Sequence, residues 1–238
     1  MCAHNSMTKK VEELAARYGR KSDVIEMARE LVEGQYDISA FKWAYAPVVT
    51  TGEEIGLARW GLVPYWVRTE DEAGKIRLKT FNARADTLFE KPSYRQAARS
   101  RRCLIPSTGF FEWRHEGKKK IPYFIYLPDE PVFSIAGIYD VWKNSETGER
   151  VDTFSMITTD ANPMMAYIHN SKQRMPAVLS RNDEERWLDP RLSEADVLSL
   201  LLPFDESQMD AYPVKNDFLR KPATDPSILE PAAPELPF

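Results

Sequence analysis

The chain has 238 residues, of which 43% are hydrophobic and 11% aromatic, which fits one large domain with a substantial core. Its two cysteines are too few for a disulfide framework, no apolar run approaches the roughly 18 residues of a membrane span, and the first residues lack a secretory signal. We therefore expect a soluble, intracellular (cytoplasmic) monomer without a membrane partner. The formal net charge of −4 argues at first against a nucleic-acid partner.

The first part of the chain combines two helical patterns with two strand-like runs. Residues 6–19 have apolar side chains at helical spacing, with Ser6 or Thr8 as a possible cap and Gly19 as a possible end. Residues 23–32 suggest a second helix. The runs "FKWAYAPVVT" and "EIGLARWGLVP" are rich in β-branched and aromatic residues, so they predict strands.

Strand signals dominate the middle of the chain, and helical signals return after it. A short helix at 91–102 is followed by predicted strands at 103–115, 121–127, 132–142 and 151–160, and then by helices at 162–170, 182–189 and 193–202. The last 18 residues contain five prolines and are expected to be extended or disordered. This order favours α+β: a single domain with a mainly antiparallel, barrel-like β-sheet core flanked by helices.

The charge is unevenly distributed along the sequence. The segment 95–120 contains eight basic residues against two acidic ones, whereas residues 181–238 contain thirteen acidic and six basic residues. A basic middle and an acidic end are compatible with one polyanion-binding face, although a solvated helix and a charged hairpin turn would give the same composition.

The terminal "MC" predicts reactive chemistry if Met1 is removed. Cys2 would then carry a free α-amine with a pKa of about 7.7–8.0, well below the roughly 10.4 of a lysine amine. This amine can attack an aldehyde, and the adjacent thiol can close a five-membered thiazolidine ring. The alternative is an incidental cysteine at a frayed terminus.

Three further polar residues stand among apolar or small neighbours: Asn82 in "TFNARAD", Glu112 in "GFFEW" and His169 in "AYIHN". In an apolar pocket Glu112 can shuttle protons, His169 can open a sugar ring to its aldehyde, and Asn82 can orient the ring oxygen. Glu112 is otherwise an ordinary surface carboxylate, and His169 a capping or core residue. His4 and His115 have no metal-ligand spacing to His169 or the cysteines, so we expect no metal and no cofactor.

An ordered set of motifs carries a specific resemblance. These are the terminal "MC", "WGLVPYW", "FNARADTLFEKPSYR", "RRCLIPSTGFFEW", "AGIYDVW" and "FSMITTDAN…IHN…RMPAVL". Between Cys2 and about Leu179 the chain resembles the SRAP (SOS response-associated peptidase) family. We accordingly expect an SRAP-like domain at residues 2–220 and a proline-rich C-terminal tail at residues 221–238.

The resemblance implies a sensor of abasic sites in single-stranded DNA that forms a covalent, lyase-like DNA–protein crosslink through Cys2 and has autopeptidase activity. It implies that Asn82 contacts the opened sugar and Arg84 grips phosphate. It also implies that Glu112 shuttles protons and that His169 promotes ring opening.

Several aromatic and basic residues in or near these motifs suit a single-stranded partner. Aromatic side chains can stack on unpaired bases, although each alone could equally belong to the core, and arginines can contact phosphates. The aromatic candidates are Trp60, Trp66, Phe110 and Trp113. The basic candidates are Arg84, Arg95, Arg99, Arg101 and Arg102.

The sequence departs from the family pattern at two places. The family commonly begins Met-Cys-Gly-Arg, whereas Ala3 and His4 follow Cys2 here, so we expect His4 to replace a DNA contact or to take part in proton transfer. The residues "NSKQ" separate His169 from Arg174, which predicts a longer loop. Two alternative functions stay open: an N-terminal-nucleophile cysteine peptidase or amidohydrolase, and a non-catalytic single-strand-binding module.

Overall fold

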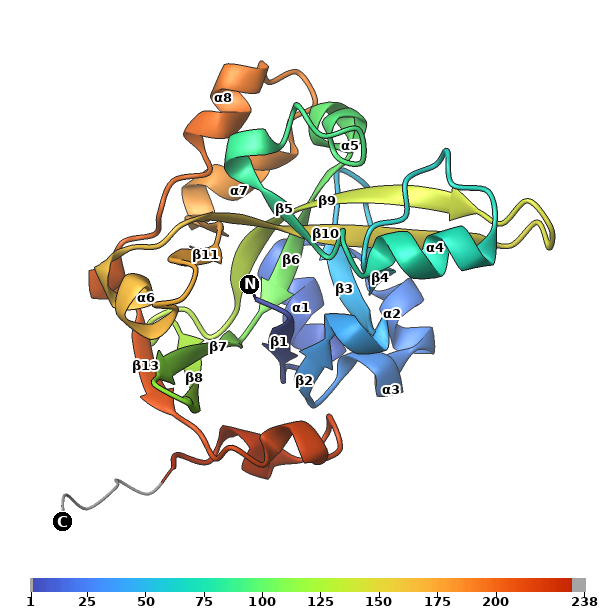
Figure 1. The fold of residues 1–238 in the computed structure, drawn as a ribbon. Coiled ribbons are helices and arrows are strands. Elements are labelled where there is room, and N and C mark those ends of the chain that lie inside the picture. Colours follow the sequence, from blue (N-terminus) through green and yellow to red (C-terminus); the bar gives the residue numbers. More distant parts are fainter. Residues whose placement is uncertain (1, 233–238) are drawn as a thin grey trace, which may run out of the picture.

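The strands pair into two sheets within residues 2–232, the part of the chain that this computed structural model describes (Figure 1). The first sheet is antiparallel, in the order β13 (Asp210–Pro213), β8 (Lys119–Tyr126), β7 (Gly109–Glu116), β1 (His4–Met7) and β2 (Gln35–Ser39). The second contains β3 (Tyr45–Val49), β4 (Ile55–Trp60), β5 (Asn82–Arg84), β6 (Arg102–Ser107), β9 (Phe133–Lys143), β10 (Arg150–Asp160), β11 (Arg174–Pro176) and β12 (Val178–Leu179).

Part of the second sheet closes on itself. Strand β9 pairs with β6 on one side and with β10 on the other, and β10–β4, β4–β3 and β3–β6 pairs complete the circuit. Among the described strands, β10 runs parallel to β4 and β5, whereas the other pairs are antiparallel. The structure thus confirms the expected α+β domain with a mainly antiparallel, barrel-like core.

The run 103–115 forms two strands rather than the single strand expected from its composition. Strand β6 belongs to the barrel and β7 to the first sheet, and the chain passes from one to the other at Thr108. Gly109 is required directly after this crossing, because a Cβ there would lie 2.1 Å from Cζ of Phe124 on β8. The crossing therefore fixes the position of the segment that carries Glu112.

Helices flank the sheets, as expected, but several bounds differ (Figure 1). They are α1 (Val11–Tyr18), α2 (Asp23–Met27), α3 (Arg29–Val32), α4 (Glu70–Arg77), α5 (Arg95–Ser100), α6 (Pro163–Ile168), α7 (Arg181–Leu188) and α8 (Glu194–Ser199). The expected helix 6–19 starts late because Ser6 and Met7 pair in β1, and it ends at Gly19 in the left-handed conformation. No helix in the described part of the chain has the length and apolarity to cross a membrane.

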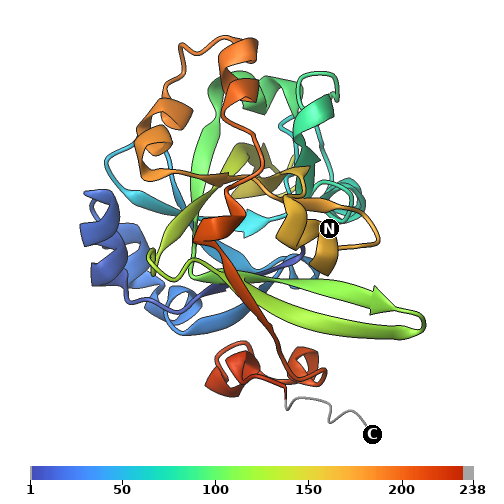
Figure 2. The same ribbon diagram turned by 90° about the vertical axis from the view of Figure 1, so that its left-hand side faces the viewer.

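The C-terminal segment, residues 214–232, packs against the first sheet (Figure 2). Phe218 and Ile228, in the 3₁₀ turns Phe218–Arg220 and Pro226–Leu229, are buried in a cluster with Phe111 and Phe124. Residues 221–232 thus differ from the extended or disordered tail expected from the prolines, because two apolar anchors offset the lack of periodicity. Residues 233–238 lie outside the described residues, and the domain boundary at residue 220 stays a prediction.

Candidate active site

The alternation of strand β7 determines where Glu112 points. Phe110 belongs to the main core, whereas Phe111 and Trp113 belong to the cluster under the C-terminal segment. Glu112 shares the face of Phe110 and is only 2% exposed, so it is not a surface carboxylate. Burial raises the pKa of Glu112 to about 7. Near neutral pH this carboxyl group can therefore both donate and accept a proton.

His169 follows helix α6, which begins at Pro163 with Asn162 as its N-cap. The loop 170–173 turns back, so that Nδ1 of His169 donates a hydrogen bond to the Arg174 carbonyl at 2.8 Å. A neutral imidazole in this tautomer has its lone pair on Nε2. Burial lowers the pKa of His169 to about 4, so the ring is neutral at pH 7 and can act as a proton acceptor.

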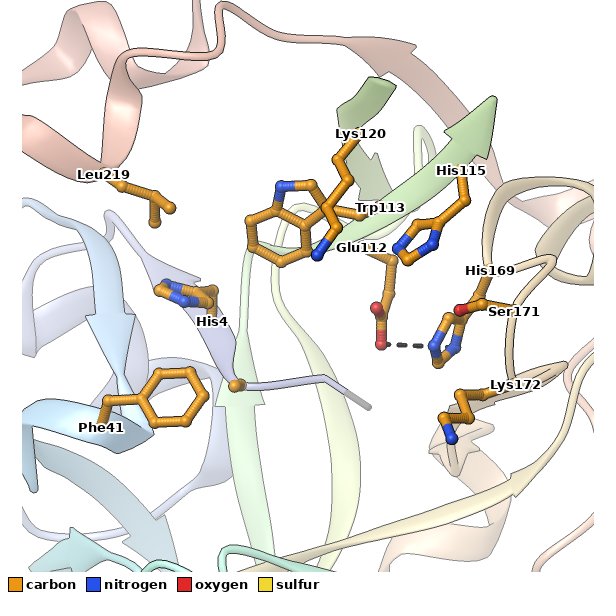
Figure 3. Close-up of a pocket in the computed structure, with 11 residues that line it drawn as sticks. His4, Phe41, Glu112, Trp113, His115, Lys120, His169, Ser171, Lys172 and Leu219 are labelled. Carbon is orange, nitrogen blue, oxygen red and sulfur yellow. Dashed lines mark ion pairs between the residues drawn. The ribbon is translucent and has the colours of Figure 1, made fainter. Parts of the chain in front are cut away.

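Glu112 and His169 meet in a cavity of about 400 Å³ (Figure 3). Oε1 of Glu112 lies 3.6 Å from Nδ1 of His169. Burial shifts both pKa values toward the neutral forms, so this contact is not a full ion pair at neutral pH. Two groups with different proton affinities thus face the same space. Within residues 2–232, no cluster of His, Cys, Asp and Glu side chains is arranged to hold a metal ion.

Cys2 is buried beside this cavity, and Asn82 holds its main chain. The Nδ2 group of Asn82 donates a hydrogen bond to the Cys2 carbonyl at 2.6 Å, across 80 residues of sequence. The buried Oδ1 atom of Asn82 has no hydrogen-bond partner among the described residues. Burial, and then the negative charge of Glu112, raise the pKa of the Cys2 thiol. The structure thus brings together the four residues that the sequence proposed as catalytic.

A second cavity, of about 590 Å³, shares Lys172 with the first and is lined by Arg84 and Arg174. Arg84 pairs with Asp86, and Arg174 lies 3.1 Å from a carboxylate oxygen of Asp160. The sequence reasoning did not weigh Arg174 as a site residue, although the matched motif "RMPAVL" contains it. Two arginines therefore stand next to the proposed catalytic residues.

His4 lines the first cavity and makes a buried pair with Asp37. Its Nδ1 atom lies 2.7 Å from Oδ1 of Asp37 on strand β2. The imidazole also contacts Trp113 edge-on, at 5.3 Å between ring centroids. No local pattern could identify Asp37 as the partner of His4, because the pair joins residues 33 positions apart.

The aromatic candidates divide between core and surface. Trp60 is 1% exposed, stacks on Phe154 and donates from Nε1 to a main-chain carbonyl, so it cannot stack on a base. Phe110 is also fully buried. Trp113 lines the cavity, and Trp66 is 45% exposed. The expectation was therefore wrong for Trp60 and Phe110, because both side chains belong to the main core.

Arg102 was also expected on the DNA face, but it is buried and all its contacts are internal. Its guanidinium donates to the main-chain carbonyls of Ala98, Arg99, Trp187 and Asp189. These carbonyls include the end of helix α5, where the last carbonyl groups have no helical partner. Arg102 therefore stabilises the packing of α5 and α7, and the prediction of a phosphate contact was wrong.

The other arginines of this basic segment lie nearer the surface. Arg99 is exposed and pairs with Glu194 on α8, and Arg101 lies 3.2 Å from a carboxylate oxygen of Asp140. Arg95 is exposed at the start of α5. A DNA contact for these three stays a prediction.

Comparison with known proteins gives a consistent result. The model of the family SOS response associated peptidase (SRAP) matches residues 1–220. "Abasic site processing protein YoqW" of Bacillus subtilis is 40% identical over 182 residues, which are 76% of this chain and 78% of that protein. "Abasic site processing protein HMCES" of Gallus gallus is 38% identical over 151 residues, 55% of this chain and 44% of that protein. A crystal structure of a protein from Bacteroides thetaiotaomicron is 53% identical, with a TM-score of 0.96 over 98% of this chain and 100% of that one.

Proposed function

The chain belongs to the SOS response associated peptidase (SRAP) family, and from this premise we propose that it senses abasic sites in single-stranded DNA and crosslinks to them through Cys2. The observation that carries the proposal is a chain of contacts: Glu112 and His169 meet in one cavity, the charge of Glu112 acts on the Cys2 thiol, and Asn82 bonds to the Cys2 carbonyl. Relatives named abasic site processing proteins support the substrate class. An abasic sugar supplies the aldehyde that this chemistry requires.

The reaction needs a free amine on Cys2, so removal of Met1 comes first. We assign the autopeptidase step to the Met1–Cys2 peptide bond. The Cys2 sulfur attacks the Met1 carbonyl, the peptide nitrogen leaves as the new amine, and water then hydrolyses the thioester and releases methionine. The amine that results has a pKa of about 7.7–8.0, so roughly 10–20% of it is unprotonated at pH 7.

Ring opening exposes the aldehyde of the abasic sugar. Nε2 of neutral His169 accepts the proton of the C1′ hydroxyl, and protonated Glu112 donates a proton to the ring oxygen as its bond to C1′ breaks. Asn82 Oδ1, which has no hydrogen-bond partner among the described residues, accepts a hydrogen bond from a sugar hydroxyl. The step leaves His169 protonated and Glu112 ionised.

The two bonds to C1′ then form in sequence. The raised pKa of the thiol keeps it protonated, so the amine attacks the aldehyde first. The carbinolamine takes the proton from His169 and loses water, which gives an iminium ion. Glu112 accepts the thiol proton as sulfur adds to the iminium carbon and closes the thiazolidine. One water is released, and both side chains return to their starting protonation states.

Most contacts to the strand come from residues that line the two cavities. We propose that Arg84, Arg174 and Lys172 bind phosphates and that Trp113 stacks on a base, with one protein molecule per abasic site. We propose a second stacking contact for Trp66, which is exposed outside these cavities. Unpaired, flexible nucleotides suit this arrangement, because the reactive sugar must enter a cavity that also admits the Cys2 amine.

Crosslinking of abasic single-stranded DNA, followed on denaturing gels, tests the proposal. We expect a heat-resistant adduct that needs no borohydride, that is absent with Cys2→Ala and that persists with Cys103→Ala, the matched control at the other buried cysteine. An adduct that survives Cys2→Ala would contradict the proposal. Steady turnover of a peptide without a DNA adduct would instead favour a peptidase, and DNA affinity without any adduct a binding module.

A further inference from the structure

We propose that one side of the cavity is a base compartment, formed by His4, Phe41, Trp113 and Leu219, that binds the nucleobase next to the abasic sugar. In this proposal the His4–Asp37 pair contacts the edge of that base. The inference rests on the proposed function and names the part of the substrate that the site recognises beyond the sugar. Figure 3 shows His4, Phe41 and Leu219 on one side of the cavity, Glu112 and His169 toward the other, and Trp113 between them.

The walls of the base compartment are apolar and aromatic. Phe41 is 57% exposed and Leu219 47% exposed, although both are large apolar side chains beside an open cavity. The Trp113 ring is supported from behind by Phe218, stacked at 5.8 Å between centroids. A flat ring system that covers these surfaces removes apolar area from water and gains stacking contacts, which favours a nucleobase as the occupant.

The His4–Asp37 pair gives the compartment a polar edge without a net positive charge. Nδ1 of His4 is engaged by Asp37, whereas Nε2 makes no hydrogen bond with any described residue. The summed charge of a histidine and an aspartate is zero or negative. This pair is therefore suited to the hydrogen-bonding edge of a neutral base rather than to phosphate. The exposed amines of Lys120 and Lys172 at the same cavity are the groups suited to phosphate.

The location of the pair links the compartment to the reaction. His4 is two residues from Cys2, and the Cys2 thiol donates a hydrogen bond to the His4 carbonyl at 3.5 Å. The C-terminal segment holds Asp37, the partner of His4. The Ala223 carbonyl accepts hydrogen bonds from the main-chain N–H groups of Tyr36 and Asp37, at 2.7 and 3.2 Å. The compartment is therefore a built extension of the reactive site.

Strands that lack one base test the proposal. Each strand carries one abasic site, and the 5′ or the 3′ neighbour is either a nucleotide or a tetrahydrofuran spacer, which keeps the phosphate but has no base. On one of the two sides, we expect the spacer to raise the half-saturating DNA concentration for crosslinking about tenfold with little change in the maximal rate. Equal half-saturation for all strands would overturn the base compartment, whereas no crosslink with any strand would overturn the proposed function instead.

Variants then assign the effect to named residues. His4→Phe keeps an aromatic ring but removes the hydrogen-bonding edge, and Leu219→Ser removes apolar wall. We expect each to reduce the tenfold difference between nucleotide and spacer, while Leu202→Ser, at an exposed leucine that lines a different cavity, leaves it intact. Asp37→Asn, which still accepts from Nδ1 of His4, should retain more of the difference than His4→Phe. The assignment would be contradicted if His4→Phe and Leu219→Ser both kept the full tenfold difference between nucleotide and spacer, in protein of unchanged unfolding temperature.

Discussion

Arg84, beside the second cavity, and Arg102, on strand β6, differ in what their guanidinium groups contact. Arg102 donates to four main-chain carbonyls and is 4% exposed, so its hydrogen-bonding capacity is used within the fold. Arg84 pairs with Asp86 at the edge of an open cavity, where a phosphate can replace the carboxylate. Arg174 at the same cavity lies near the Asp160 carboxylate, but its guanidinium also donates to the Thr158 carbonyl. A basic residue is therefore a candidate phosphate ligand only where its donors are not all used by main-chain carbonyls of the fold.

The largest effect should come from Glu112 at the cavity. Glu112→Gln removes the proton donor for ring opening and the acceptor for the thiol proton, so we expect the crosslinking rate to fall about 100-fold or more. The wild-type rate should be bell-shaped in pH, since the amine must lose a proton and Glu112, with a pKa of about 7, must keep one. Initial rates between pH 5 and 9 check this, and an unchanged alkaline limb in Glu112→Gln would exclude Glu112 as the donor.

The same substitution should change stability in the opposite direction. The pKa of Glu112 rises from 4.5 to about 7 on folding, so the folded protein binds more protons and loses stability as the pH rises through that window. The loss amounts to about 3 kcal/mol above pH 7. Glu112→Gln should therefore unfold at higher urea concentration than wild type at pH 8, with a smaller difference at pH 5. A constant difference across this range would contradict the buried carboxyl as its cause.

Arg102 gives the matching test in the basic segment. Arg102→Ala leaves several buried carbonyl groups without donors, so we expect the free energy of unfolding to fall by about 3 kcal/mol. Crosslinking by the folded fraction, and its dependence on salt, should stay as in wild type. If DNA affinity depended less steeply on salt concentration in this variant than in wild type, Arg102 would after all contact DNA.

In contrast to Arg102, Arg174 should affect DNA binding rather than stability, and the effect should be smaller. If Arg174 binds one phosphate, Arg174→Gln should weaken DNA binding severalfold and reduce the slope of log K against log salt by about 0.7. Fluorescence anisotropy with an uncleavable abasic analogue at several salt concentrations measures both quantities. An unchanged slope would remove Arg174 from the phosphate contacts.

Arg99 should have the smallest effect of the series. Its ion pair with Glu194 is about half exposed on both sides, and such pairs contribute about 0.2–1 kcal/mol. Arg99→Ala should therefore change neither the urea midpoint nor the salt slope by more than the error of the measurement. A loss of salt slope equal to that of Arg174→Gln would place helix α5 on the DNA face after all.

Local signals predicted much of the fold. Gly19 ends α1, Asn162 caps α6, and the turn residues between β9 and β10 mark their hairpin, because each of these depends on neighbours in the sequence. Helix α4 was not predicted, although the capping pattern of Thr69 and Glu72 at its start is present in the sequence. The break at Thr108 could not be predicted from alternation, because both strands are apolar and extended.

The candidate site was predictable where one motif carries the residue, as for Cys2, Asn82, Glu112 and His169. The partners of these residues were not predictable, because Asp37 and the Ala223 carbonyl approach the cavity from distant parts of the chain. The burial of two candidate DNA contacts was also not predicted. Tryptophan and arginine are residue types that often bind DNA, and only the closure of the barrel and the packing of α7 place Trp60 and Arg102 inside.

Intact-mass spectrometry of the protein before and after incubation with abasic single-stranded DNA is the decisive test of a crosslink through Cys2. We expect a mature chain that lacks Met1 and an adduct whose mass is that of protein plus DNA minus one water. Retention of Met1 in a chain that still forms the adduct, or an adduct of the same mass with Cys2→Ala, would contradict it.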